Sequence, residues 1–360
     1  MTAKRIRFDF SANPNDANGT SYRDRYQTSI AVARHGHALG FDTVWLAEHN
    51  FTDYFPTPSP LVTLSHIAAH CPGLGLGTQV LVSPWYNPVR LASEIAMLST
   101  LSTGHLHMGL GRGTAPREYQ GYGIDMNKSL ALFRETVEIL QRALTGAPFT
   151  YAGEEFRIER ETRIMPTPDP RRITLYGAAT RPQSSERLAA LDLGLLHTPA
   201  GSHDSQRRMI AAYETVLNEH GFRNDRDKPV LLGAVIAPTD AEAIALAREH
   251  APQFFALSAA HYEADAGVQG NYKDYEDFVK FFERMKTMRS AEGVDGYIYS
   301  QLVGSPDTVA KRVQGYIDAG FDRIIVHGDL PSVPRRNQLR NLELFAREVA
   351  PRFDPQFRPR

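Results

Sequence analysis

The stretch GFDTVWLAEHNFTDYF, residues 40–55, begins as a buried strand and ends as a polar and aromatic loop. Residues 43–46 are β-branched or apolar, which is typical of a short strand buried on both faces of a parallel sheet. An acid, an imidazole and three aromatic side chains follow: Glu48, His49, Phe51, Tyr54 and Phe55. In parallel α/β folds, reactive side chains lie at the carboxyl ends of the strands. The stretch therefore predicts an α/β protein with a functional site after this strand.

The same alternation of a short apolar run and an amphipathic segment recurs close to eight times along the chain. The apolar runs predict strands over residues 6–11, 43–46, 74–82, 106–111, 173–178, 195–199, 230–237 and 323–328. Helical spacing predicts helices over residues 23–39, 60–70, 88–98, 129–145 and, as the last helix, 306–319. Eight βα units predict a TIM barrel, and a doubly wound open sheet is the alternative that this pattern leaves open.

Two segments depart from this pattern. Residues 149–158 predict a small hairpin, and residues 252–300 are aromatic, polar and interrupted by glycines, with no convincing strand. We interpret the chain as one domain, residues 1–360, with an insertion at 252–300 before the last βα unit. A connection of that length predicts a lid or binding segment.

Composition excludes several classes of function. The 40 Lys and Arg residues nearly balance the 41 Asp and Glu residues, so no strong field favours nucleic acid or an anionic membrane. The single cysteine, Cys71, allows neither an intramolecular disulfide nor a cysteine-based metal site. Cys71 lies beside Pro72 at a predicted helix end, and the sequence contains no GxSxG motif, so neither a thiol nor a serine nucleophile is supported. The first 30 residues contain no apolar run typical of a signal peptide. We therefore expect a cytoplasmic protein that acts on a small molecule.

Arg112 lies in MGLGRGTAPREY, residues 108–119, where glycines flank it at the end of a predicted strand. Glycines let a ligand approach the backbone, and an arginine fork suits a phosphate or a carboxylate. Thr114 stands where the third glycine of a dinucleotide motif would be, which weakens a Rossmann interpretation. A plain turn with a solvated arginine is the alternative.

The next strand ends in GAATRPQSSER, residues 177–187. Here Thr180, Ser184 and Ser185 are expected to cap a helix that begins at Pro182. The free N–H groups of that helix, together with Arg181, would form a second anion site beside Arg112. Simple helix capping is the alternative.

His49, next to Glu48, is a candidate for acid–base chemistry because an imidazole titrates near neutrality. A structural histidine remains the alternative. No HExxH spacing occurs and no second histidine stands near this pair, so we expect no metal. Trp85 follows the third predicted strand and could line an apolar pocket together with the aromatic residues after His49, although ordinary packing explains it equally well.

Four motifs together resemble the bacterial luciferase-like flavin monooxygenases: GFDTVWLAEHNFT, LGTQVLVSPWYNPVR, GRGTAPREYQGYGIDM and VGSPDTVAKRVQGYIDAGFDRIIV. The resemblance implies a TIM barrel that binds reduced FMN, which reacts with molecular oxygen to give a flavin hydroperoxide that oxygenates a small organic substrate. It implies a catalytic role for His49 and an acid near the flavin at Glu118. It places the phosphate at Arg112, Thr180, Arg181 and Ser184, and a cis peptide under the flavin at Gln79 and Val80.

The resemblance also implies partners and alternatives. No NAD-binding half is visible, so a separate flavin reductase is expected, and the second and third helices are expected to form a homodimer interface. Asn50, Gly111 and Thr180 depart from the family's pattern, which argues against light emission and for a remodelled substrate pocket. A deazaflavin-dependent oxidoreductase on the same barrel and a non-catalytic flavin-binding protein remain alternatives.

Overall fold

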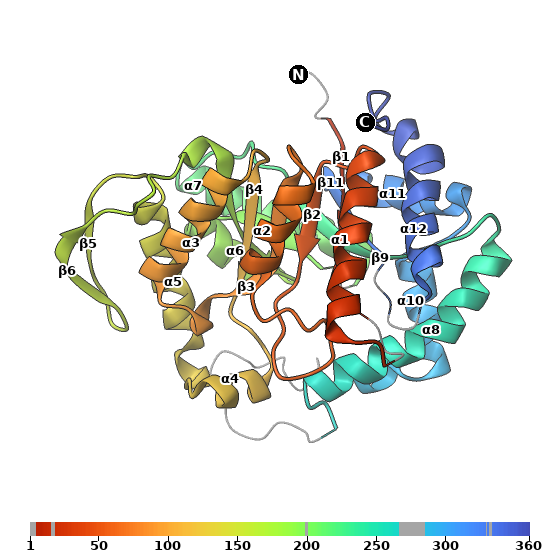
Figure 1. Cartoon of the computed structure of the whole chain (residues 1–360), viewed down its shortest axis with the longest axis horizontal. Coiled ribbons are helices and arrows are strands. Elements are labelled where there is room, and N and C mark those ends of the chain that lie inside the picture. Colours follow the sequence, from red (N-terminus) through yellow and green to blue (C-terminus); the bar gives the residue numbers. More distant parts are fainter. Residues whose placement is uncertain (1–4, 16–18, 199–200, 266–284, 329, 331–332) are drawn as a thin grey trace.

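Eight parallel strands form a closed barrel in the computed structural model, which describes residues 5–15, 19–198, 201–265, 285–328, 330 and 333–360 (Figure 1). The barrel strands are β1 (Arg7–Ser11), β2 (Thr43–Leu46), β3 (Gly75–Val82), β4 (Leu106–Gly111), β7 (Ile173–Ala179), β8 (Gly194–His197), β9 (Pro229–Ile236) and β11 (Arg323–His327). Sequential neighbours pair from β1 to β8, while β11 lies between β9 and β1. The pair His197–Val230 joins β8 to β9 and closes the barrel. The TIM barrel prediction is confirmed and the open-sheet alternative is wrong.

Helices surround the barrel and most begin where the sequence predicts. They are α1 (Tyr22–Ala38), α2 (Pro60–His70), α3 (Pro88–Leu101), α5 (Ser129–Ala143), α6 (Pro182–Ala190), α7 (His203–Glu219), α8 (Asp240–His261), α11 (Pro306–Asp318) and α12 (Arg335–Leu344). Ser59, Asn87 and Ser305 accept backbone N–H bonds at the starts of α2, α3 and α11, and proline occupies the first turn of each.

Several short elements complete the fold. They are α4 (Pro116–Tyr122), α10 (Ala291–Ser300), β10 (Leu302–Gly304), the 3-10 turns Ser83–Trp85, Met126–Lys128, Pro170–Arg172 and Ala350–Arg352, and one π-helical turn, Phe345–Val349. Strand β10 pairs in parallel with β9. None of the helices in the described part of the chain is long and apolar enough to cross a membrane.

The C-terminal part of the chain differs from the sequence prediction in two respects. The helix predicted over residues 306–319 is confirmed as α11, but α12 follows it, so the prediction that it is the last helix is wrong. The insertion expected at residue 252 has its boundary inside α8, which continues through Pro252 to His261. Residues 266–284 of the expected lid lie outside the described residues. The lid itself therefore stays a prediction.

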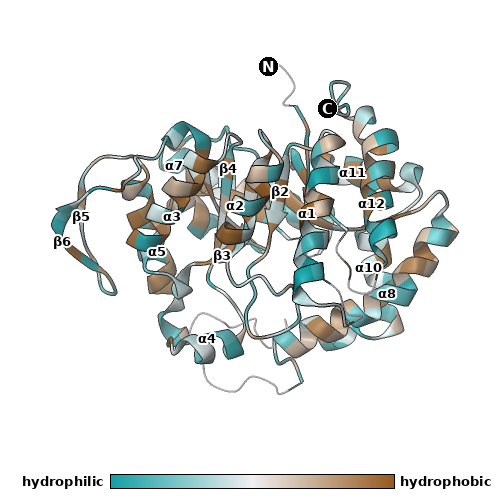
Figure 2. Cartoon of the chain, viewed as in Figure 1, coloured by the Kyte–Doolittle hydropathy of each residue, from teal (hydrophilic) through white to brown (hydrophobic). Residues whose placement is uncertain are grey.

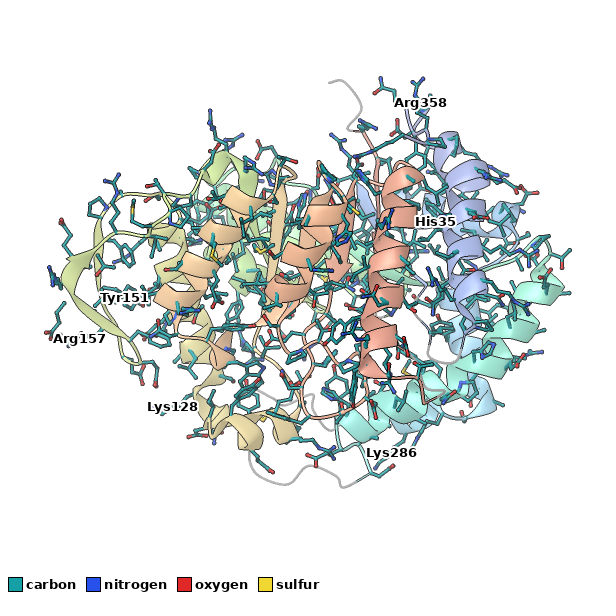
Figure 3. The ribbon with its side chains drawn as sticks, in the orientation of Figure 1. His35, Lys128, Tyr151, Arg157, Lys286 and Arg358 are labelled. Atoms are coloured by element: carbon teal, nitrogen blue, oxygen red, sulfur yellow. The ribbon has the colours of Figure 1, made fainter. Side chains whose placement is uncertain are left out.

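The predicted hairpin is confirmed as β5 (Phe149–Ala152) and β6 (Arg157–Thr162), which project from the side of the barrel (Figures 1 and 3). Strand β6 is largely exposed and hydrophilic (Figure 2). The hairpin is held at its turn by Glu135 of α5, whose buried carboxylate accepts the backbone N–H groups of Glu154, Glu155 and Phe156 at 2.8–3.3 Å. Tyr151 also donates to Glu138 at 2.7 Å.

A buried ion network lies at the end of the barrel opposite the strand ends that carry the candidate site. Arg323 of β11 donates to both carboxylate oxygens of Asp9 on β1 at 2.9 Å and also contacts Asp227 at 2.7 Å. The indole N–H of Trp45 on β2 donates to Asp9 at 2.7 Å. Because these partners come from adjacent strands, the network fixes β1, β2 and β11 relative to one another and leaves the opposite mouth free for chemistry.

Candidate active site

The loop after β2 turns His49 into the carboxyl-end mouth of the barrel. Phe51 and Phe55 adopt positive φ values of 64° and 46°, which bulky side chains rarely tolerate outside constrained loops. His49 forms an isolated antiparallel bridge with Thr57, which fixes the loop at both ends. The aromatic wall predicted from the sequence is only partly assembled. Tyr54 lies 4.7 Å from the His49 ring centroid and Phe55 lies 6.3 Å from it.

The other two members of the predicted wall are not in ring contact with His49 in the described part of the chain. Phe51 is 56% exposed and packs on Tyr122, and Trp85 stacks on Tyr122 at a centroid distance of 5.1 Å. A cavity of about 380 Å³ opens beside the loop. It is lined by Tyr22, Tyr26, His49, Asn50, Phe51, Thr52, Asp53, Pro56 and Pro58. One side of His49 therefore faces a space large enough for a small organic molecule.

Glu48 points inward and supports the neighbouring strand. Its carboxylate accepts the backbone N–H of Val82 at 2.8 Å and a hydrogen bond from Tyr86. Burial raises the pKa of Glu48 to about 8. The side chain is only 2% exposed, and its hydrogen bond to Val82 holds the end of β3 against the loop.

Glu118 comes from α4 and reaches the same site. Its carboxylate accepts the backbone N–H of Asn50 at 2.6 Å, and Tyr122 donates to the side-chain oxygen of Asn50 at 2.9 Å. Burial raises the pKa of Glu118 to about 7. The structure thus brings together the three residues predicted as catalytic, His49, Glu48 and Glu118, within one buried polar cluster.

His261, at the end of α8, is the site residue that sequence reasoning missed. Its ring centroid lies 4.6 Å from that of His49, its Nδ1 lies 2.7 Å from the Thr52 hydroxyl, and its Nε2 lies 3.7 Å from a Glu118 oxygen. The ligand atoms of His49, His261 and Glu118 all lie within 4.8 Å of one another. The premise that no second histidine is near His49 is therefore wrong, because the fold supplies one from far along the chain.

Burial sets the charge of this histidine pair. It lowers the pKa of His261 to about 3. Burial, and then the neighbouring His261, hold the pKa of His49 well below its usual value. Both rings are therefore neutral near pH 7, in the form that accepts a proton or binds a metal.

Strand β3 contains the cis peptide bond that the resemblance implied, between Gln79 and Val80 near its carboxyl end. Gly111, at the end of β4, faces Val80 so closely that an added Cβ would lie 2.4 Å from a Val80 methyl carbon. Gly111 therefore allows β4 to approach the cis peptide.

The predicted anion site is rearranged. Helix α6 begins at Pro182 as expected, but its N-cap is Arg181 and no side chain caps it, so the predicted capping by Thr180, Ser184 and Ser185 is wrong. Ser184 and Ser185 instead donate to the carbonyls of Arg181 and Pro182. The N–H groups of this first turn are therefore not occupied by those hydroxyls.

A cavity of about 320 Å³ lies beside this turn, at the carboxyl ends of β7 and β8. It is lined by Thr180, Arg181, Pro182, His197, Gly201, Ser205, Gln206, Arg208 and Met209. Thr180 and Arg181 thus line it, whereas Arg112 and Ser184 do not. Arg112 follows the adjacent strand β4, and its carbonyl accepts the hydroxyl of Tyr119.

Two buried polar atoms in this cavity lack hydrogen-bond partners among the described residues, Nε2 of His197 and Nε2 of Gln206. The Nδ1–H of His197 donates to the Ala179 carbonyl at 2.8 Å, which leaves Nε2 as an acceptor in the neutral ring. Burial lowers the pKa of His197 to about 4, so the ring stays neutral. This acceptor suits a ligand hydroxyl, while the Gln206 amide and the arginines suit an anion.

Comparison with known proteins agrees with this architecture. Residues 7–323 match the family model described as luciferase-like monooxygenase. The alkanal monooxygenase alpha chain of Photorhabdus luminescens is 26% identical over 193 residues, which cover 53% of each chain. The F420-dependent glucose-6-phosphate dehydrogenase of Nakamurella multipartita is 25% identical over 365 residues, which cover 98% of each chain.

Solved structures give the same picture of the fold. The monooxygenase RslO1 from Streptomyces bottropensis superposes with a TM-score of 0.80 at 22% identity, covering 97% of this chain and 100% of its own. The oxygenating constituent of 3,6-diketocamphane monooxygenase from Pseudomonas putida, in complex with FMN, gives 0.75 at 19% identity, covering 97% and 99%. At these sequence identities the likeness shows a shared fold and nothing further about activity.

Proposed function

The chain belongs to the luciferase-like monooxygenase family, and we propose that within this family it is a reduced-FMN-dependent monooxygenase that receives its flavin from a separate reductase. The single observation that supports FMN most directly is the cavity beside the first turn of α6. It combines a helix start that no side chain caps, two arginines and the buried polar atoms of His197 and Gln206. A phosphate and a polyhydroxyl chain on one ligand would satisfy all of these groups.

The remaining residues fit the rest of such a ligand. In this proposal Arg181 and Arg208 bind the phosphate, His197 accepts a hydroxyl, and the floor at Gln79 and Val80 supports the ring system. Reduced flavin would supply the electrons that activate molecular oxygen. The protein would contribute orientation, a proton acceptor at His49 and a site from which water is excluded.

His49 is placed to exchange a proton with a reacting group in the adjoining cavity. It is neutral near pH 7 and has Tyr54 and Phe55 packed around it. Glu48 joins the loop that carries His49 to the end of β3 through the Val82 N–H, and Glu118 holds the backbone N–H of Asn50, the residue after His49. We propose that these carboxyl groups position His49, which is the group that touches the reactants.

A deazaflavin-dependent oxidoreductase is the second candidate, and one comparison favours it. The relative from Nakamurella multipartita, which matches nearly the whole chain, is named as an F420-dependent enzyme. The same anion cavity would accept the phosphate of either cofactor, so the two proposals differ in their use of oxygen.

An anaerobic titration tests the proposal. We expect reduced FMN to bind more tightly than riboflavin or a reduced deazaflavin. When oxygen is admitted, the bound flavin should be oxidised, and a transient change in its absorbance should be seen. Arg208→Ala should weaken FMN binding and leave riboflavin binding unchanged, because only FMN carries the phosphate. Tighter deazaflavin binding without oxygen consumption would favour the second candidate. Binding of flavin with no reaction at all would indicate a flavin-binding protein.

A further inference from the structure

Three metal-ligating side chains meet in the barrel mouth although they come from distant parts of the chain. His49 follows β2, Glu118 lies on α4 and His261 ends α8. Their ligand atoms lie within 4.8 Å of one another, and one pair, His261 Nε2 and a Glu118 oxygen, is 3.7 Å apart. Ligand atoms around a tetrahedral zinc ion are about 3.4 Å apart, since each lies roughly 2.0–2.1 Å from the metal. Side-chain shifts of about 1 Å would close the site.

Two of these three ligands, His261 and Glu118, already make outer hydrogen bonds. The Nδ1 of His261 bonds to the Thr52 hydroxyl at 2.7 Å, and the Glu118 carboxylate accepts the Asn50 N–H at 2.6 Å. Metal-binding histidines and carboxylates usually have such partners, which fix the ring and the tautomer. Two of the three side chains are therefore already held by such partners.

In contrast, one ring nitrogen of each histidine lacks a hydrogen-bond partner among the described residues. Nε2 of His261 and Nδ1 of His49 are buried and have no hydrogen-bond partner in the described part of the chain. Buried polar atoms are nearly always paired in native proteins, so such atoms indicate a bound group.

We propose that His49, His261 and Glu118 bind one divalent transition-metal ion of the zinc class when no flavin occupies the mouth. Two imidazole nitrogens and one carboxylate form a common three-ligand set for zinc, which leaves the fourth position open to water. The ion would engage the imidazole that the proposed function requires, so metal binding and turnover would exclude each other. This last consequence rests on the proposed function, whereas the metal site itself does not.

The test uses the flavin-free full-length chain and Co²⁺ as a spectroscopic probe, followed by calorimetry with Zn²⁺. We expect one ion per chain and visible absorption bands typical of tetrahedral cobalt. His261→Gln and Glu118→Gln should each weaken binding by well over tenfold, and Thr52→Val by about 10–100-fold through loss of the outer hydrogen bond. Circular dichroism confirms that each variant is folded.

The matched control is His70→Gln. His66 and His70 lie one turn apart on the exposed face of α2 with ring centroids 4.8 Å apart, so they form an alternative surface site. The control should retain the cobalt spectrum. Absence of binding, or binding that survives His261→Gln and is lost in His70→Gln, would overturn the proposal.

Turnover separates this inference from the proposed function. Zn²⁺ should inhibit flavin-dependent turnover of the wild-type chain, and a chelator should restore it. A chain that binds cobalt as predicted but shows no flavin chemistry would refute the proposed function alone. A chain that turns over normally with Zn²⁺ present and binds no cobalt would refute the metal site alone.

Discussion

His49 is the residue on which the proposed chemistry depends most directly. Its ring packs against aromatic side chains and has one side facing a cavity, while the proposed phosphate site lies at β7 and β8. We therefore predict that His49→Ala leaves the affinity for reduced FMN unchanged and lowers product formation by about 10²–10⁴-fold, the usual contribution of a positioned acid–base group. Parallel flavin titration and product assay check this. Undiminished turnover would remove His49 from the mechanism.

Gly111 allows a close backbone approach that a side chain would prevent. An added Cβ would lie 2.4 Å from a methyl carbon of Val80, whose branched side chain has little freedom to move. We expect Gly111→Ala to lower the free energy of unfolding by about 1–3 kcal/mol, the usual cost of overpacking. The double variant Gly111→Ala, Val80→Ala should recover most of the loss because it removes the methyl group. Urea denaturation measures both, and equal destabilisation of the single and double variants would contradict the clash.

Residue-level prediction from sequence is accurate where the chemistry is local and incomplete where it depends on packing. His49, Glu48 and Arg112 could be found because each directly follows an apolar run that reads as a strand. His261 could not, because its contact with His49 arises only when α8 packs across the mouth. The one local sequence signal for His261 is the pair His261–Tyr262 at the end of an alanine-rich segment. Because a proline usually ends a helix, Pro252 argued against the continuous helix that carries this pair.

At the level of elements, Glu135 links α5 to the projecting hairpin. One buried carboxylate satisfies three consecutive backbone N–H groups, which would otherwise require water. We predict that Glu135→Ala destabilises the hairpin by about 1–3 kcal/mol and speeds amide exchange at residues 149–162, with little change at the barrel strands. Hydrogen exchange measured by mass spectrometry tests this. Arg134→Ala is the matched control. It removes the half-exposed partner that lies 3.7 Å from the Glu135 carboxylate but none of the three backbone N–H hydrogen bonds, so the hairpin should stay protected.

Helix boundaries were predictable where capping residues mark them. Helix α2 spans Pro60–His70 as predicted, because Ser59 and Pro60 define its start. Helix α12 was missed because its buried face contains Gln338 and Asn341, which give no apolar period. Asn341 is buried there because its amide oxygen accepts the Ile236 N–H and its amide nitrogen donates to the Ala234 carbonyl at the end of β9. Tertiary hydrogen bonds of this kind leave no trace in hydrophobic spacing.

For the molecule as a whole, eight apolar runs and their helices favoured the barrel over a doubly wound open sheet, because a TIM barrel is built from eight βα units. The contacts that hold the barrel closed were not predictable. They are the pairing of β8 with β9 and the buried network of Asp9, Arg323 and Trp45, whose members are far apart in the sequence. The overall class therefore follows from periodicity, whereas the register of the strands follows from packing.

The outer surface of α2 and α3 supports a proposal about assembly. Val62, Met97 and Leu101 lie on these two helices and are 70%, 51% and 61% exposed, which is unusual for large apolar side chains on neighbouring helices. Small residues such as Ala68 and Ser93 on the same helices would allow a second copy to approach closely. We propose that this surface joins two copies of the chain.

Light scattering should then give a mass of twice 40.2 kDa for the wild-type protein. Val62→Glu combined with Leu101→Glu should shift it to the monomer mass, because each change places a charge in an apolar interface. Tyr299→Glu is the matched control: Tyr299 is 69% exposed but lies on α10, away from this surface, so the dimer should persist. A wild-type chain that stays monomeric at every concentration, or a dimer that survives both glutamates, would exclude α2 and α3 as the interface.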